Sequence, residues 1–170
     1  PSTLPFQAPD FSRIKDSDFA PAYEAGMRQQ LAEVRAIADN PAAPTFDNTF
    51  VALEKSGQML SRVDMTFGAL TAANTDDALQ KTQEDVAPKL AAHADAIYLD
   101  PKLFKRIEAI YNTRDSLKLD PESLRLVEWY YLDFVHHGAR LSDAAKGKLQ
   151  ELNKEESTLS TAFITKLLAA

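Results

Sequence analysis

The residues with the clearest potential for chemistry lie in one apolar run, LVEWYYLDFVHHGARL, which spans residues 126–141. The run contains the adjacent pair His136 and His137. Two histidines on one helix hold a metal ion when they are four residues apart, whereas neighbours point about 100° apart. His93, the third histidine of the chain, could join them only through a tertiary contact. The pattern therefore favours one partly buried and one surface histidine over a metal site.

Four aromatic residues of the same run could form a box around a ligand. They are Trp129, Tyr130, Tyr131 and Phe134. Their spacing spreads them over most of a helix circumference, and a helix that is apolar nearly all round is usually buried among other helices. We therefore predict core packing for these side chains. Gly138, close to the end of the run, indicates either a helix C-cap or the close approach of another helix.

Acidic residues cluster in two short stretches, which contain Asp76, Asp77, Glu151, Glu155 and Glu156. Acid–base catalysis needs carboxylates that converge in a cleft and have shifted pKa values. The three glutamates instead lie beside Lys148 and Lys154, an arrangement typical of a solvated helix face. We predict a surface role for all five.

Composition and motifs narrow the possible functions further. The chain has neither the HExxH zinc motif, nor a GxSxG elbow, nor a glycine-rich phosphate loop. The absence of cysteine excludes disulfides, thiolate ligands and cysteine nucleophiles. A net charge of −6 argues against a nucleic-acid partner, and no apolar run is long enough for a membrane span. The residues alone therefore assign no catalytic, cofactor-binding or metal-binding residue.

The elements that must position these residues are predicted to be helices. The chain has only five glycines and no Asn-Gly or Asp-Gly hairpin signal, and its apolar residues recur at spacings of three and four. We predict about six helices in an antiparallel, bundle-like array that forms a single domain over residues 1–170. The first is expected over residues 18–38. Thr45 is the expected N-cap of the second, whose apolar stripe runs over residues 46–70.

The later helices have clear start signals. Thr75, followed by two aspartates, starts the third helix, and Pro88 should kink or split it. Asp100-Pro101 and Asp120-Pro121 each join a capping residue to a proline at the first helical position, which predicts helices over residues 102–116 and 122–138.

The last helix starts at Ser142 and is still apolar and periodic at Ala170, with no glycine cap or proline stop. The first residue is Pro1 and not methionine. We therefore expect a segment of a longer protein. Faces that pack on the missing part should form a large exposed apolar patch.

Several segments resemble the thimet oligopeptidase family of zinc metallopeptidases. Residues 43–63, APTFDNTFVALEKSGQMLSRV, are similar to a stretch near the start of that family. Residues 134–170 fit its order of an aromatic residue, Gly-Ala-x-Leu, spaced leucines and Ser-x-x-Phe before a leucine pair. That pattern is supplied by Phe134, Gly138, Ala139, Leu141, Leu149, Leu152, Leu159, Ser160, Phe163, Leu167 and Leu168.

Residues 2–27 and 115–128 also fit, so the resemblance covers essentially all 170 residues. It is strongest to the bacterial peptidyl-dipeptidase (dipeptidyl carboxypeptidase) branch, with the oligopeptidase A branch next. One departure is Ile164-Thr165-Lys166, a turn in which the family often has asparagine.

The resemblance implies the N-terminal helical segment of a larger, mostly helical, two-lobed peptidase. In this family an HExxH motif and a later glutamate hold zinc and activate water. Those positions have no counterpart in this chain, so no catalytic, cofactor or metal residue carries over. The implied role is to form part of the wall of a channel that admits short or unfolded peptides and excludes folded proteins. The parent enzyme releases dipeptides from the C-terminus of the peptides that enter.

The expected partners follow from that role. They are the missing C-terminal catalytic lobe of the same chain and, for the parent, short peptide substrates, with no nucleic acid and no membrane. The lone segment is expected to be inactive, to bind no zinc itself and to self-associate. A cytoplasmic location is expected, with the periplasm as the exception. The alternative is a stand-alone helical adaptor with an apolar groove for a partner helix.

Overall fold

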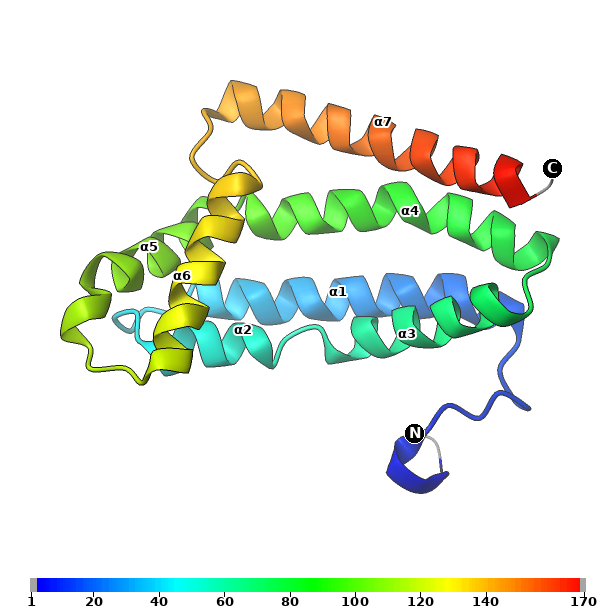
Figure 1. The fold of residues 1–170 in the computed structure, drawn as a ribbon, viewed down its shortest axis with the longest axis horizontal. Coiled ribbons are helices and arrows are strands. Elements are labelled where there is room, and N and C mark those ends of the chain that lie inside the picture. Colours follow the sequence, from blue (N-terminus) through cyan, green and yellow to red (C-terminus); the bar gives the residue numbers. More distant parts are fainter. Residues whose placement is uncertain (1–2, 169–170) are drawn as a thin grey trace.

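Four long helices set the shape of the molecule in the computed structural model, which describes residues 3–168. The long helices are α1 (Phe19–Ala38), α3 (Gln58–Ala73), α4 (Asp77–Tyr98) and α7 (Asp143–Leu168). Two further helices, α5 (Pro101–Thr113) and α6 (Pro121–His136), pack at one end, and α6 has the same 16 residues as α3 (Figure 1). Residues 3–168 contain no β-strand, which confirms the predicted all-α fold.

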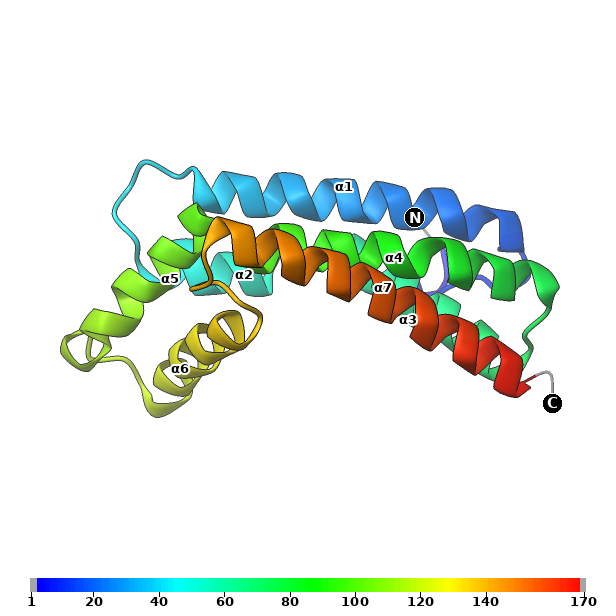
Figure 2. The same cartoon turned by 90° about the horizontal axis from the view of Figure 1, so that it is seen from above.

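The long helices are arranged in layers. Helix α4 lies between α7 and α1, and α3 packs against α1 (Figures 1 and 2). Consecutive long helices run in opposite directions along the molecule (Figure 1). The shorter elements are η1 (Pro5–Gln7), η2 (Asp16–Asp18), the π-helical turn η3 (Asp47–Val51), α2 (Ala52–Glu54) and η4 (Arg114–Ser116). The antiparallel, bundle-like array predicted from the sequence is therefore present.

Most helix starts fall where the sequence places them. The Oδ1 atom of Asp100 accepts the backbone N–H groups of residues 102 and 103 at 2.8 and 3.0 Å. Asp120 does the same for residues 122 and 123, both at 3.0 Å. Each aspartate thus satisfies two of the N–H groups that a helix start leaves unpaired. At the start of α4 the capping side chain is Asp76 and not Thr75, since Asp76 accepts the N–H of Leu79 at 2.8 Å.

The predicted helix over residues 46–70 is wrong, because the structure breaks it at Gly57. Thr45 does cap its start, since the N–H of Asn48 donates to Oγ1 of Thr45 at 3.1 Å. Gly57, however, has a φ of 71°, in the left-handed region that ends a helix. Its N–H donates to Oε2 of Glu33 on α1 at 2.8 Å, and a Cβ there would lie 2.3 Å from Nε2 of Gln30. The break therefore follows from contacts with α1.

Pro88 does not split α4, which runs unbroken through it for 22 residues. A proline inside a helix removes one backbone hydrogen bond, and tertiary packing can override that loss. Leu79 and Val86 on the N-terminal side are buried, as is His93 on the C-terminal side. These buried positions hold both halves of α4 against the rest of the molecule.

The apolar core consists of two clusters. The larger joins the second half of α1 to η3, α2, α5 and α6, and its buried members are Val34, Ile37, Phe50, Leu53, Leu103, Phe104, Ile107, Ile110, Val127, Tyr131, Phe134 and Ala139. The smaller joins the first half of α1 to α3 and α4 through Phe19, Tyr23, Met27, Phe67, Leu79 and Val86. Among the described residues, neither cluster includes a side chain from α7.

Two hydrogen bonds and a tight corner help to hold α7 against α4. Nδ2 of Asn153 donates to Oδ1 of the buried Asp95 at 2.6 Å, and Nζ of Lys146 donates to the carbonyl of Leu99 at 3.1 Å. Gly138, with a φ of 91°, ends α6 in the left-handed conformation. A Cβ on it would lie 2.7 Å from Cδ2 of Leu149 on α7. Both sequence interpretations of Gly138, a C-cap and a close helix approach, are therefore confirmed.

Within residues 3–168, none of the helices combines the length and the apolar character that crossing a membrane requires.

Candidate functional site

The structure does not bring the three histidines together. His93 is buried on α4, where its Nε2 lies 2.7 Å from Oε1 of Gln30 on α1. The ring of His137 stacks on that of Tyr98 with centroids 4.0 Å apart, but His137 is exposed, as is His136. The prediction that one of these two histidines is partly buried is therefore wrong. In the described part of the chain, no group of three or more His, Cys, Asp or Glu residues is arranged to hold a metal ion. The residues present therefore do not fit a zinc site.

The five acidic residues selected from the sequence are all exposed, as predicted. Asp76 is engaged in capping α4. Glu156 accepts a hydrogen bond from the hydroxyl of Ser160, one turn further along α7, at 2.8 Å. These carboxylates lie on helix surfaces and do not converge in a cleft.

The aromatic residues of α6 divide between the core and the surface. Tyr131 and Phe134 are buried in the larger cluster, and Tyr130 is half-buried. Trp129, in contrast, is 50% exposed, and Leu132 is also exposed. The prediction of a helix buried all round is therefore wrong. Helix α6 packs with one face on α5 and the core, and its opposite face has no covering element among the described residues.

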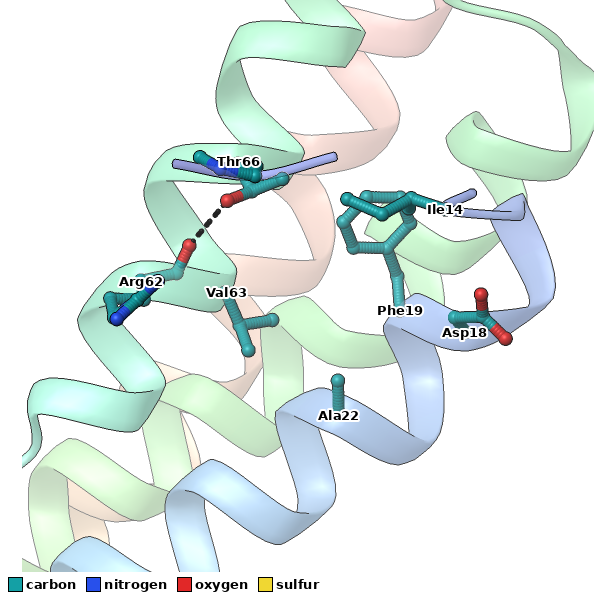
Figure 3. Close-up of a pocket in the computed structure, with 8 residues that line it drawn as sticks. Ile14, Asp18, Phe19, Ala22, Arg62, Val63 and Thr66 are labelled. Atoms are coloured by element: carbon teal, nitrogen blue, oxygen red, sulfur yellow. Dashed lines mark hydrogen bonds between the residues drawn. The ribbon is translucent and has the colours of Figure 1, made fainter. Parts of the chain in front are cut away.

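A shallow hollow of about 210 Å³ lies where the N-terminal segment crosses α1 and α3. Figure 3 shows Ile14 lying against Phe19 over its apolar wall. The hydrogen bond drawn in it joins the hydroxyl of Thr66 to the carbonyl of Arg62 at 2.7 Å, which is a local contact within α3. The hollow therefore has the character of an incompletely packed helix junction and offers no convergent catalytic groups.

A second cavity, of about 250 Å³, lies between α1, α4 and α6 and has a more mixed lining. Its apolar part is made by Val34, Leu53, Ala94, Ile97 and Phe134, and its polar part by Gln30, Ser56, His93, Tyr98 and Tyr130. His93 is only 7% exposed, and its Nδ1 has no hydrogen-bond partner. An unsatisfied buried polar atom of this kind is rare in folded proteins.

Two tyrosines that line this cavity form hydrogen bonds with carboxylates outside its lining. The hydroxyl of Tyr130 donates to Oε1 of Glu54 at 2.6 Å, and that of Tyr98 donates to Oδ2 of Asp133 at 2.9 Å. Burial raises the pKa of Tyr98 to about 12, and the hydrogen bond to Asp133 adds to the rise. The pKa of Tyr130 is also raised, first by burial and then by Glu54. Both phenols therefore stay protonated at neutral pH and act as donors to the carboxylates.

Helix α7 has an exposed face on which large apolar side chains gather. Four large side chains at helical spacing lie on it, 57–68% exposed: Leu152, Leu159, Phe163 and Leu167. Ile164, beside them, is also exposed. We call Leu152, Leu159, Phe163 and Leu167 the α7 stripe. Large apolar patches of this kind mark surfaces that contact another protein segment, and the patch expected from the sequence is therefore present.

The fold and the sites define a helical segment with an uncovered apolar face, whose described residues hold no assembled metal centre. No family model matches the chain. Two proteins do match it: a dipeptidyl carboxypeptidase of Salmonella typhimurium is 49% identical over 169 residues, and one of Escherichia coli is 48% identical over 169 residues. Both alignments cover 99% of this chain. The chain is therefore similar in sequence to these dipeptidyl carboxypeptidases, as its resemblance predicted, and it spans about 25% of their length.

Several polar contacts of the site were not predicted from the sequence. The partners Tyr130 and Glu54 are 76 residues apart, and His93 and Gln30 are 63 apart. Single phenols and carboxylates are common on helix surfaces, so their types alone give no signal. Only the packing of α6 and α4 against α1 brings Tyr130, His93 and Gln30 to one cavity.

Proposed function

We propose that this chain is the N-terminal helical segment of a zinc peptidyl-dipeptidase, an enzyme that releases dipeptides from the C-terminus of short peptides. The observation that carries the proposal is the 48–49% identity to dipeptidyl carboxypeptidases along 99% of this chain. Identity at this level along nearly every residue supports a shared fold and a shared place in the parent protein.

The α7 stripe supports a structural role for the segment within that parent. Burying one leucine or phenylalanine side chain contributes about 1.5–3 kcal/mol. Four such side chains lie exposed on one helix face. We infer that this face packs against the C-terminal catalytic lobe of the same chain. The segment then forms part of a channel wall that limits which peptides reach the reaction centre.

In this proposal the zinc ion and the catalytic residues belong to the remainder of the parent. The described residues of the segment do not fit a metal site, so no step of the reaction is assigned to them. The isolated chain is accordingly expected to be inactive and to bind no zinc. A cytoplasmic location also stays a prediction.

The test uses the full-length parent and reads out the zinc-dependent release of C-terminal dipeptides. Changing Leu159 and Phe163 together to aspartate should greatly reduce activity, because two charges would have to be buried at the lobe contact. Lys154→Gln, at an exposed position on the opposite side of α7 from the stripe, serves as the matched control and should leave activity unchanged. Full activity of the double variant, or peptide hydrolysis by the isolated chain, would contradict the proposal.

The same stripe also predicts the behaviour of the isolated chain. Two copies can cover each other's exposed leucines, so the 170-residue chain should self-associate in sedimentation velocity. The double aspartate variant should sediment as a monomer with the same helix content. A wild-type chain that remains monomeric at high concentration would contradict self-association through the α7 stripe.

An independent helical adaptor is the alternative, and the apolar face of α7 is compatible with it. Such a module would use the stripe to hold a partner helix. The length of the native reading frame separates the two proposals. A frame that continues to an HExxH motif and a later glutamate supports the peptidase, whereas a stop soon after residue 170 supports the adaptor.

A further inference from the structure

Helix α7 lies along α4 and packs mainly against it (Figure 2). In residues 143–167 no side chain of α7 is buried, but several are half-buried. Six of these repeat every four residues and so share one face: Ala145, Leu149, Asn153, Ser157, Thr161 and Thr165. Only one of the six has a large apolar side chain, whereas the α7 stripe is exposed. The face of α7 that meets α4 is therefore more polar than the face that meets solvent.

Hydrophobic burial does not explain this orientation. An amphipathic helix normally turns its apolar stripe toward the core, because burial of leucine and phenylalanine side chains stabilises the fold. The hydroxyls on the half-buried face do not explain it either. Those of Thr161 and Thr165 donate to carbonyls of α7 itself at 2.8 and 3.1 Å, so they are satisfied at any rotation of the helix. Another contact must fix the rotation of α7.

A buried hydrogen bond between the two helices can fix it. Nδ2 of Asn153 donates to Oδ1 of Asp95 on α4 at 2.6 Å, and Asp95 is only 7% exposed. Adjacent helix positions point about 100° apart, so a turn of α7 by one position brings Leu152 to α4 and takes Asn153 away from this carboxylate. A buried carboxylate that loses its partner is costly.

The other hydrogen bond that the described residues of α7 donate to α4 is less restrictive. Nζ of Lys146 reaches the carbonyl of Leu99 at 3.1 Å. The lysine side chain is a flexible stem of four carbons, so its ammonium group can follow the carbonyl through a range of helix rotations. The pair of Asp95 and Asn153 is therefore the contact that distinguishes one rotation from the others.

We propose that Asp95 and Asn153 form a positioning pair that fixes the rotation of α7 on α4 and so keeps the α7 stripe exposed, where a partner can reach it. A single buried polar residue fixes the register of coiled coils in a similar way. The pair selects one orientation and adds little stability, because its buried polar groups give up hydrogen bonds to water. The inference holds whether or not the chain belongs to a peptidase.

The rotation of α7 can be measured as a distance between two spin labels by electron paramagnetic resonance. The chain has no cysteine, so Ala69→Cys on α3 and Lys154→Cys on α7, both at exposed positions, create its only labelling sites. Side chains reach about 5–6 Å from a helix axis, so a turn of about 100° moves them by about 8 Å. Dilution with unlabelled chain removes distances between copies. The labelled chain should give one narrow distance distribution.

The leucine pair Asp95→Leu/Asn153→Leu removes the hydrogen bond without leaving a buried charge. It should keep the helix content and the urea midpoint of unfolding. Its distance distribution should be about twofold wider, because several rotations of α7 then have similar energies. Asp95→Asn should keep the narrow distribution, since an amide oxygen can still accept from Asn153. Asp95→Asn/Asn153→Ala, which removes the hydrogen bond with smaller side chains, should also widen it and replaces the leucine pair if that variant does not fold.

The matched control is Ser157→Ala/Thr161→Ala, which makes the same face of α7 more apolar and leaves the pair intact. Its distance distribution should be as narrow as that of the unchanged chain. A broad distribution in the unchanged chain would overturn the proposal. So would a narrow distribution in both variants that lack the hydrogen bond, or equal widening in the control.

Discussion

Helices α5 and α7 both carry a periodic apolar stripe, yet the structure treats the two stripes in opposite ways. Helix α5 has 13 residues and buries Leu103, Phe104, Ile107 and Ile110. Helix α7 has 26 residues and leaves its four-residue stripe exposed. The comparison teaches that a periodic pattern identifies the face of a helix that needs a partner, but not whether the partner lies within the same stretch of chain.

The largest effect is expected from changing one leucine on each helix to alanine. Leu103 on α5 is 0% exposed, whereas Leu159 on α7 is 62% exposed. Leu103→Ala leaves a cavity in the core and should lower the free energy of unfolding by about 3 kcal/mol. Leu159→Ala should change it by less than about 0.5 kcal/mol in the isolated chain. Urea unfolding at low protein concentration measures both, and similar losses would refute the contrast.

The next-largest change in stability is expected at the buried arginine of α5. Arg106 is 6% exposed, and its guanidinium donates to the carbonyls of Asn40 and Ala42 and to Oδ1 of Asn48 at 2.7–3.0 Å. Arg106→Gln removes these contacts from the loop between α1 and η3 and should lower the free energy of unfolding by about 2 kcal/mol.

Lys105→Gln is the control for Arg106, because Lys105 is the exposed neighbour on the same helix. It should change the free energy of unfolding by less than about 0.5 kcal/mol. Hydrogen exchange of residues 39–48 gives a second measurement, since loss of the anchor should accelerate exchange in this loop. Unchanged exchange in Arg106→Gln would show that the loop is held by other contacts.

Replacing either of two glycines near the start of α7 with alanine should change the free energy of unfolding, with opposite signs at the two positions. Gly138 has a φ of 91° and no room for a Cβ, whereas a Cβ on the helical Gly147 would meet no atom within 4 Å. Gly138→Ala should destabilise the chain by about 1–2 kcal/mol through strain at the α6–α7 corner. Gly147→Ala should stabilise it by about 0.5–1 kcal/mol. Thermal unfolding followed by circular dichroism measures both changes. A shift of the unfolding temperature in the same direction for both variants would contradict this prediction.

Local signals predict well where the helices start. Asp100, Asp120 and Ser142 start helices at the predicted positions, because a cap acts within the first helical turn. The break at Gly57 was not predicted, since it depends on Glu33, 24 residues earlier on another helix. Helical periodicity alone continues through residue 57.

The candidate site was even less predictable than the helix break. Its cavity walls come from four helices, and the polar pairs of the wall residues join positions 35–76 apart in the chain. In the sequence, the adjacent His136 and His137 are the most conspicuous candidate residues, but both lie on the surface. His93, which drew less attention, is the histidine that the fold places in a buried wall.

The smallest expected effect is a pH dependence of the free energy of unfolding that arises from His93. Burial lowers the pKa of this imidazole below its ordinary value of 6.5, so the folded chain favours the neutral ring. The unfolded chain then binds more protons as the pH falls below about 6.5, and stability decreases through the folded-state pKa. Urea unfolding at several pH values should show this decrease in the wild type and a weaker one in His93→Gln. Gln30→Glu sharpens the test, because it places a carboxylate where Oε1 now lies 2.7 Å from Nε2. That charge favours the imidazolium, so the contribution of His93 to stability should reverse and persist at low pH. Identical pH profiles of the free energy of unfolding for all three proteins would show that the contact between α1 and α4 does not respond to this histidine.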